Sequence, residues 1–169
     1  MPELQRVQWI TARAGLTRSE RRRSAGFTVL ELLIVITIML VIAALAVPGM
    51  QSAIASARNA RATSDVRTLG NAALGWYLQY GSPPATLNDI GYGGQNDPWG
   101  SPYQYLNIST NLGTGVRRTD RFGVPINTYF EMYSMGPNRN SAASLSATQS
   151  QDDIIWANDG FYIGGAASF

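Results

Sequence analysis

The 169-residue chain has no cysteine, no histidine and no lysine, so all 13 of its positive side chains are arginine. These absences exclude disulfide frameworks, thiol nucleophiles, zinc sites built from cysteine or histidine, and any Ser-His-Asp triad. Charged residues make up only 14% of the chain, whereas glycine and proline number 17 and 8. The composition therefore suits one turn-rich domain beside a very apolar segment, and most of the usual catalytic side chains are missing.

The charge is concentrated at the N-terminus. Residues 1–26 carry six arginines and two glutamates, a net charge of +4, whereas the other 143 residues carry seven arginines and nine acids, a net charge of −2. The arginine cluster 21–23 stops just before a hydrophobic run. This order predicts membrane orientation, with the N-terminal side in the cytoplasm, and not nucleic-acid binding.

The hydrophobic run extends from Phe27 to Val47 and contains one charged residue, Glu31. As a helix of 21 residues it would be about 31 Å long, close to the roughly 30 Å core of a bilayer. Three interpretations compete: a single-pass anchor, a secretory signal peptide cleaved after the small residues 44–46, and a processed filament subunit. A carboxylate inside a membrane costs about 2.5–3.5 kcal/mol near the centre, so Glu31 requires a partner.

The string SAGFTVLELLIV, residues 24–35, resembles the prepilin signature of type IV pilins and type II secretion pseudopilins. The resemblance implies cleavage after Gly26 by the prepilin peptidase and methylation of the new amine of Phe27. That amine would lie four residues before Glu31, about 6 Å along the helix axis. We expect Glu31 to pair with the amine of a neighbouring subunit during assembly, or alternatively to make a contact within its own helix.

The expected fold is α+β and pilin-like: a long N-terminal helix, membrane-spanning in its first half, packed on a small antiparallel sheet with long loops. Helical spacing continues over residues 50–80 in an apolar stripe, after a kink or loosening at residues 48–49, and residues 81–84 end the helix. Strands are expected at 103–108, 126–133, 154–157 and 161–163, the last two joined by a tight turn at 158–160. The stripe consists of Val66, Leu69, Ala73, Trp76 and Tyr80.

Polar segments of this region are expected to face solvent. Arg117, Arg118 and Arg121 are predicted to form a solvated loop cluster, and residues 141–150 a flexible loop. Arg61 and Asp65 are spaced for an ion pair on one helix face.

A second motif is similar to a segment of the major pseudopilins of type II secretion. It reads Asp97-Pro98-Trp99-Gly100-Ser101-Pro102-Tyr103-Gln104-Tyr105. Two prolines, a glycine and a large aromatic residue predict a rigid structural turn and not a catalytic site. Together with the prepilin string and the helix between them, it extends the resemblance over most of residues 24–105.

The resemblance also implies a structural calcium ion near the C-terminus, with no other cofactor required. Its ligands would be Asn138, Asp152, Asp153 and the carbonyl of Met135, because calcium prefers oxygen ligands. Asn138 stands where the family commonly has aspartate, and the intervening loop is rich in serine where the family has glycine and acids.

The sequence thus resembles a pseudopilin precursor with a leader (1–26), a transmembrane or filament-core helix (27–48), an amphipathic continuation (49–81) and a periplasmic region of loops and strands (82–169). The resemblance implies a structural role without catalysis, in an inner-membrane protein that forms a periplasmic filament. Implied partners are further copies of the chain, minor pseudopilins, the prepilin peptidase, the secretion platform with its assembly ATPase, and lipid before assembly. A type IV pilin serving adhesion, motility or DNA uptake and a membrane-anchored or secreted binding domain remain as alternatives.

Overall fold

The structure is a computed structural model that describes residues 26–169, so all of the predicted leader except Gly26 lies outside the described residues. The chain divides into two compact units, one ending at Ala43 and the other running from Ala44 to Phe169. One helix, α1, spans Val29–Tyr80 and accounts for 52 residues. Pro48 lies inside α1 and does not end it.

The C-terminal end of α1 is set by Gly81, as predicted. Gly81 has φ 75°, and its N–H donates to the carbonyl of Tyr77 at 2.8 Å. A glycine in the left-handed region closes the last turn without a Cβ penalty. Two prolines, Pro83 and Pro84, follow and prevent the helix from resuming.

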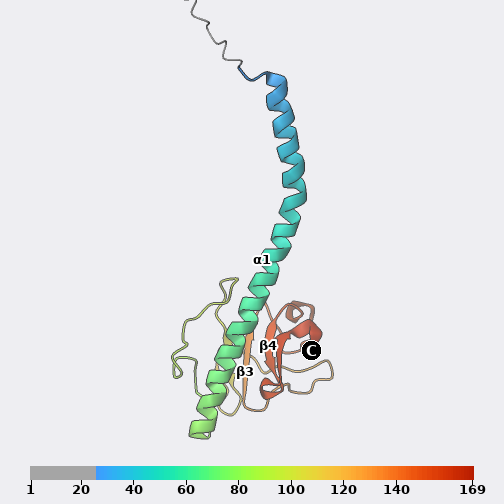
Figure 1. The fold of residues 1–169 in the computed structure, drawn as a ribbon. Helices are drawn as coiled ribbons and strands as arrows, with labels where there is room; N and C mark the ends of the chain where they lie inside the picture. The colour runs from blue at the N-terminus through green and yellow to red at the C-terminus, as the bar shows by residue number, and fades with distance from the viewer. Residues whose placement is uncertain (1–25) are drawn as a thin grey trace, which may run out of the picture. The chain divides into compact units, whose positions relative to one another are not determined.

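The second unit contains a five-stranded antiparallel sheet in the order β2-β1-β3-β4-β5. Figure 1 shows the second half of α1 lying across one face of this sheet, in front of β3 and β4. The fold is therefore the predicted α+β arrangement. The strand bounds are β1 Gln104–Asn107, β2 Leu112–Gly113, β3 Phe130–Ser134, β4 Ile154–Ala157 and β5 Tyr162–Gly165.

Both faces of the central strands are buried, because the helix covers one face and the C-terminal loops cover the other. All five residues of β3 are buried, and so are all four of β4. Alternate side chains along a strand therefore enter different cores. The helix-side core comprises Ala62, Val66, Leu69, Ala73, Tyr103, Tyr105, Phe130, Met132, Ile154 and Trp156; the loop-side core comprises Ile126, Tyr133, Leu145, Ile155, Ala157 and Ala166.

Helix α1 approaches the sheet most closely at Gly70. A Cβ built on Gly70 would lie 2.1 Å from Cε3 of Trp156 in β4. The absence of a side chain here lets the indole ring pack directly on the helix backbone. The predicted apolar stripe is confirmed from Val66 to Ala73, but it ends there, because Trp76 is only partly buried and Tyr80 is 57% exposed.

The C-terminal strands differ from prediction in two places. The expected strand at 126–133 begins only at Phe130, because Ile126 bonds to loop backbone: its N–H donates to Arg118 O and its carbonyl accepts from Asn158 N. The short strand β2 was not expected at all. The turn between β4 and β5 was expected, and it is the 3₁₀ segment η2, Asn158–Gly160, in which Asn158 and Asp159 both have φ 53°.

The polar run 141–150, predicted to be a flexible loop, contributes two residues to the interior of the second unit. Leu145 and Ser150 are buried, and the run ends in the 3₁₀ segment η1, Thr148–Ser150. The Ser150 hydroxyl accepts from Ala142 N at 2.9 Å and donates to Ala142 O at 3.2 Å. The segment is therefore tied to itself and supplies Leu145 to the loop-side core. A further 3₁₀ segment, η3 (Ala166–Ser168), follows β5.

Candidate functional site

The first candidate site is the start of α1, where the predicted processing position lies. Gly26 and Phe27 precede the helix, and Phe27 is 86% exposed. Nothing lies within 4 Å of a Cβ built on Gly26. The peptide bond expected to be cut is therefore outside regular structure and unobstructed by the described residues.

Glu31 takes part in a hydrogen-bonded cap at the first turn. Its backbone N–H donates to Thr28 Oγ1 at 3.1 Å, while its Oε2 accepts from Thr28 N and Thr28 Oγ1, both at 2.9 Å. This reciprocal arrangement is a capping box, which satisfies backbone donors that the first turn of a helix leaves free. Thr28 is the N-cap, since its carbonyl accepts the first helical bond, from Leu32 N. Within the described residues, Glu31 thus has a partner in its own chain.

The helix beyond this cap presents apolar side chains on every side. Every large hydrophobic residue from Phe27 to Val47 is between 43% and 86% exposed. This part of α1 is long and apolar enough to cross a membrane, and none of its most apolar window is buried by the described residues. A helix that is apolar all round requires surroundings of lipid or of other helices.

The turn at Asp97 is organised by one carboxylate. Its Oδ1 accepts from Trp99 N at 3.0 Å and Ser101 N at 2.9 Å, and its Oδ2 accepts from Ser134 Oγ in β3 at 2.6 Å. Gly100 has φ 90°. Asp97 therefore holds both the turn and its attachment to the sheet.

The aromatic residues of this turn attach it to the helix. Trp99 packs against the helix-side core, and the hydroxyl of buried Tyr103 donates to Asp65 at 2.8 Å. Burial, followed by the Asp65 contact, raises the pKa of Tyr103, so this hydroxyl keeps its proton. Asp65 also forms the predicted ion pair with Arg61, at 3.6 Å. The turn is structural, as predicted.

Arg118 lies in the interior of the second unit, contrary to the prediction of a solvated loop. It is fully buried, and its Nη2 lies 2.5 Å from Oδ2 of Asp153, which is also fully buried. Ser141 Oγ donates to the same Oδ2 at 2.6 Å and accepts from Nη1 of Arg118. The guanidinium carbon lies 4.4 Å from the centroid of the Tyr133 ring. The prediction was wrong because sequence alone did not reveal a buried carboxylate 35 residues away.

A second buried carboxylate, Glu131, lies beside this pair. It accepts from the backbone N–H of Arg118 at 3.0 Å and from Asn127 Nδ2 at 2.7 Å. Burial raises the pKa of Glu131 to about 7, although these hydrogen bonds and the charge of Arg118 oppose the shift. Burial likewise raises the pKa of Asp153, against the Ser141 hydrogen bond and the Arg118 charge.

Comparisons of the sequence with known proteins identify the family of this chain. The model of the prokaryotic N-terminal methylation motif matches residues 21–47. The type II secretion system core protein G of Aeromonas hydrophila is 32% identical over 108 residues, which cover 52% of this chain and 76% of the relative. The corresponding protein of Pseudomonas aeruginosa is 34% identical over 109 residues with the same coverage. The chain belongs to the type II secretion system core protein G family. No solved structure gave a significant match.

Membership of the core protein G family confirms the resemblance to the major pseudopilins. The methylation motif covers Gly26, Phe27 and Glu31, so the predicted processing residues and the capping box fall inside the matched segment. The chain is accordingly a membrane-anchored pseudopilin subunit of type II secretion.

The calcium ion implied by the resemblance does not fit the three side chains among its expected ligands, Asn138, Asp152 and Asp153. Asn138 directs its Nδ2 at Asp152 Oδ1 (2.5 Å) and at Gln149 O, while its Oδ1 accepts from Asn140 N at 2.6 Å. An amide held in this way presents a donor, which a cation cannot use. Asp152 also accepts from Asn138 N at 3.1 Å. Asp153 faces Arg118, and no cluster of three or more acidic, histidine or cysteine ligands occurs in residues 26–169.

The unsatisfied atoms of the Arg118–Asp153 pair do not form a cation site either. Asp153 Oδ1 and Arg118 Nε are buried without a hydrogen-bond partner among the described residues. One is an acceptor and the other a donor. A polar group with both properties would satisfy the two atoms, whereas a metal ion would satisfy only the carboxylate.

The sequence analysis did not anticipate two features of these sites, the capping role of Thr28 and the burial of Arg118. Thr28 was detectable, because threonine three residues before glutamate at the start of an apolar run is the signature of a capping box. The burial of Arg118 had no local signal, since its partners come from β3 and from the segment between β3 and β4.

Proposed function

We propose that this chain is the major subunit of a type II secretion pseudopilus. After cleavage between Gly26 and Phe27 and methylation of Phe27, α1 would leave the membrane and assemble with further copies into a periplasmic filament. That filament would drive protein export, together with minor pseudopilins, the secretion platform and its assembly ATPase. The chain would be oriented with its N-terminus in the cytoplasm, in keeping with the arginine-rich leader.

The observation that carries this proposal is the uncovered apolar surface from Phe27 to Val47. Each buried methylene contributes about 0.8 kcal/mol, so exposing 15 large apolar side chains to water would be prohibitive. Lipid covers such a surface before assembly. Equivalent helices of neighbouring copies would cover it afterwards, at no loss of apolar contact.

Glu31 supports assembly over simple anchoring. A simple anchor would gain the same capping box from a neutral glutamine, without the desolvation cost that a carboxylate carries in an apolar helix. The capping box uses only Oε2 of Glu31 among the hydrogen bonds of the described residues. The carboxylate thus retains an oxygen and a negative charge for a neighbouring subunit's amine, and such a pairing would set the register between copies.

The decisive experiment begins with the mature N-terminus. The membrane fraction is isolated from cells that carry the peptidase, and the chain is analysed by mass spectrometry. An N-terminus at methylated Phe27 is expected. An intact Met1 would indicate a plain anchor, and a start at Val47 would indicate a secretory signal; either result overturns the proposal.

Two Glu31 variants then separate the charge from the cap. Glu31→Gln keeps an acceptor for Thr28 and removes the charge, whereas Glu31→Ala removes both. We expect both variants to enter the membrane and be cleaved, and both to fail to form filaments with the secretion machinery present, as seen by electron microscopy of sheared cells. If only Glu31→Ala fails, the cap and not the charge is required; normal filaments from both contradict the role given to Glu31.

A further inference from the structure

The segment between β3 and β4, residues 135–153, returns to the sheet through a buried ion pair. Arg118 lies before β3, and Asp153 is the last residue before β4. Their side chains meet at 2.5 Å with both residues fully buried. The pair therefore ties the end of this segment to the loop that precedes β3.

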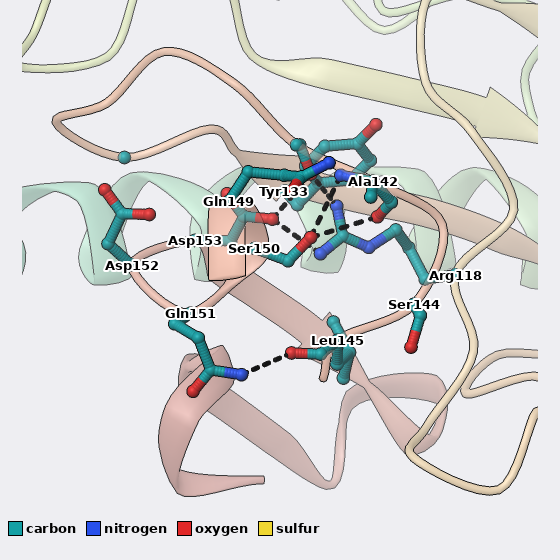
Figure 2. A network of polar contacts seen from close by, with 12 residues as sticks. Arg118, Tyr133, Ala142, Ser144, Leu145, Gln149, Ser150, Gln151, Asp152 and Asp153 are labelled. Atoms are coloured by element: carbon teal, nitrogen blue, oxygen red, sulfur yellow. Dashed lines mark hydrogen bonds and ion pairs between the residues drawn. The ribbon is translucent and has the colours of Figure 1, made fainter. Parts of the chain in front are cut away.

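Other residues contact both the guanidinium and the backbone of Arg118. Ser141 bridges the two side chains, Tyr133 lies under the guanidinium plane, and Glu131 accepts from the backbone N–H of Arg118. Figure 2 shows Asp153 turned toward Arg118, while Asp152 points away from it. Planar stacking on an aromatic ring and forked donation to a carboxylate are properties of arginine in particular.

We propose that the Arg118 guanidinium serves as the built-in cation of this loop, so that the folded domain of this chain is independent of calcium. The inference does not rest on the proposed filament function, because it concerns the stability of the folded chain alone.

Charge balance supports this assignment. Asp153 is neutralised by Arg118, and adding a divalent ion next to both aspartates would place three positive charges against two negative ones. A calcium ion also requires six to eight oxygen ligands at about 2.3–2.6 Å. The position next to Asp153 Oδ2 is taken by an arginine nitrogen at 2.5 Å, and a cation there would be repelled by the guanidinium.

The hydrogen bonds of the neighbouring carboxylate, Asp152, also support the assignment of Arg118 as the cation. Asp152 is capped by the backbone and side-chain N–H groups of Asn138. A Cβ built on Gly136 would lie 2.2 Å from the carbonyl oxygen of Asp152, so the two backbone segments are in direct contact at this corner. Protein groups thus occupy both carboxylate oxygens of Asp152 and the Oδ2 of Asp153.

The first test uses the full-length processed chain, purified in detergent micelles. Thermal unfolding is followed by circular dichroism in a chelator and in about 5 mM calcium chloride, above the ~10⁻³ M limit of weak extracellular calcium sites. The midpoints are expected to agree within about 1 °C, whereas a site occupied at a hundred times its Kd would raise Tm by several degrees. A calcium-dependent rise of several degrees overturns the proposal.

Substitutions at Arg118 and Asp153 then test whether the guanidinium is the cation that neutralises Asp153. Arg118→Met should lower Tm by roughly 10 °C or more, because it leaves Asp153 buried and unpaired. The double variant Arg118→Met/Asp153→Leu should recover most of the loss, since an apolar pair of similar volume replaces the ion pair. It keeps the measurement informative if the single variant does not fold.

Asp152→Asn is the matched control. It removes the neighbouring carboxylate without touching the Arg118 pair, and it should leave Tm within about 2 °C of the wild type, with and without calcium chloride. A drop in Tm of Asp152→Asn confined to calcium-containing buffer would show that the two aspartates share a metal ion, and would overturn the role of Arg118. Recovery of Arg118→Met by calcium chloride to the wild-type Tm would instead support it, as an external cation would then fill the vacated position.

Discussion

The two halves of α1 differ in where their apolar side chains find partners. From Phe27 to Val47 every large hydrophobic residue is at least 43% exposed, whereas Val66 and Leu69 in the same helix are 0% and 1% exposed. The second half is covered by its own sheet, through contacts such as that of Trp156 with Gly70. The first half requires partners from outside the chain.

The two halves of α1 therefore contribute to different properties: the second half to the stability of the folded domain, and the first half to contacts outside the chain. Apolar residues in the second half contribute to the free energy of unfolding of the domain, because folding removes them from water. Residues in the first half contribute little to that free energy, because folding of the single chain leaves them uncovered; in the proposed function they contribute to insertion and to contacts between copies. The same substitution should therefore have different consequences in the two halves.

Leu69→Ala and Leu32→Ala provide the sharpest test of this difference. Leu69→Ala should destabilise the domain by about 2–5 kcal/mol, because it leaves a cavity in the helix-side core. Leu32→Ala should change the free energy of unfolding of the domain by less than about 0.5 kcal/mol, because Leu32 is 60% exposed. Chemical denaturation in micelles, followed by tryptophan fluorescence, measures both; equal effects would contradict the separation.

The two glutamates provide a second test, through pH. Glu31 is exposed at the helix start, whereas Glu131 is buried with a pKa raised from 4.5 to about 7. Between pH 4.5 and about pH 7, the Glu131 carboxyl group is protonated in the native state and ionised in the unfolded state. The free energy of unfolding therefore falls as the pH rises through this range. The full shift corresponds to an upper limit of about 3–4 kcal/mol.

Glu131→Gln should remove this pH dependence while keeping an acceptor for one of the two donors, Arg118 N or Asn127 Nδ2. The measurement is the difference in unfolding free energy between the wild type and Glu131→Gln from pH 5 to pH 8. We expect the wild type to lose stability relative to the variant across this range. A difference that does not change with pH would show that Glu131 ionises in the folded domain as it does in the unfolded chain.

Two glycines of α1 give a third comparison, of intermediate size. Gly70→Ala places a Cβ against Trp156 and should cost about 1–3 kcal/mol, because the indole ring must move. Gly75→Ala meets nothing within 4 Å and should be neutral or stabilising by up to about 1 kcal/mol, through helix propensity. Thermal unfolding of the two variants side by side tests whether the helix contacts the sheet at Gly70; a stabilising Gly70→Ala would place the contact elsewhere.

The smallest effect is expected at the cap. Thr28→Ala removes the N-cap side chain and should weaken the first turn by about 1 kcal/mol without altering domain unfolding. Hydrogen exchange in micelles should then be roughly five times faster at the Leu30 and Glu31 amides. Thr37→Ala is the control, since the Thr37 hydroxyl donates to the carbonyl of Leu33 inside the helix and caps nothing. Unchanged exchange in Thr28→Ala would show that the capping box does not hold the first turn.

Local patterns were sufficient to predict much of the fold. Gly81 ended α1 where expected, and β4 coincides with the predicted strand. The turn at Asp97 was predicted from its prolines and glycine, and the motif at 24–35 was confirmed by the match to the methylation family. Each of these features depends on neighbouring residues and on intrinsic backbone preferences.

Other features were mispredicted or missed, because they depend on contacts between residues that are distant in the sequence. Arg118 lies between polar residues in sequence, and only the return of the chain at Asp153 gives its charge a buried partner. The serine-rich run 141–150 had no periodicity, yet it packs Leu145 into the loop-side core. The strand β2 has two residues, too few for a recognisable alternation.

The apolar run, its single carboxylate and the basic leader follow from the order of residues alone, since hydropathy and charge act over one helix length. The burial of Arg118, the fit of Gly70 under Trp156 and the use of Asn138 as a donor to Asp152 were decided by the tertiary structure. Burial and hydrogen bonding of this kind depend on which residues meet across the sheet. Contacts between segments tens of residues apart leave no periodic trace in the chain.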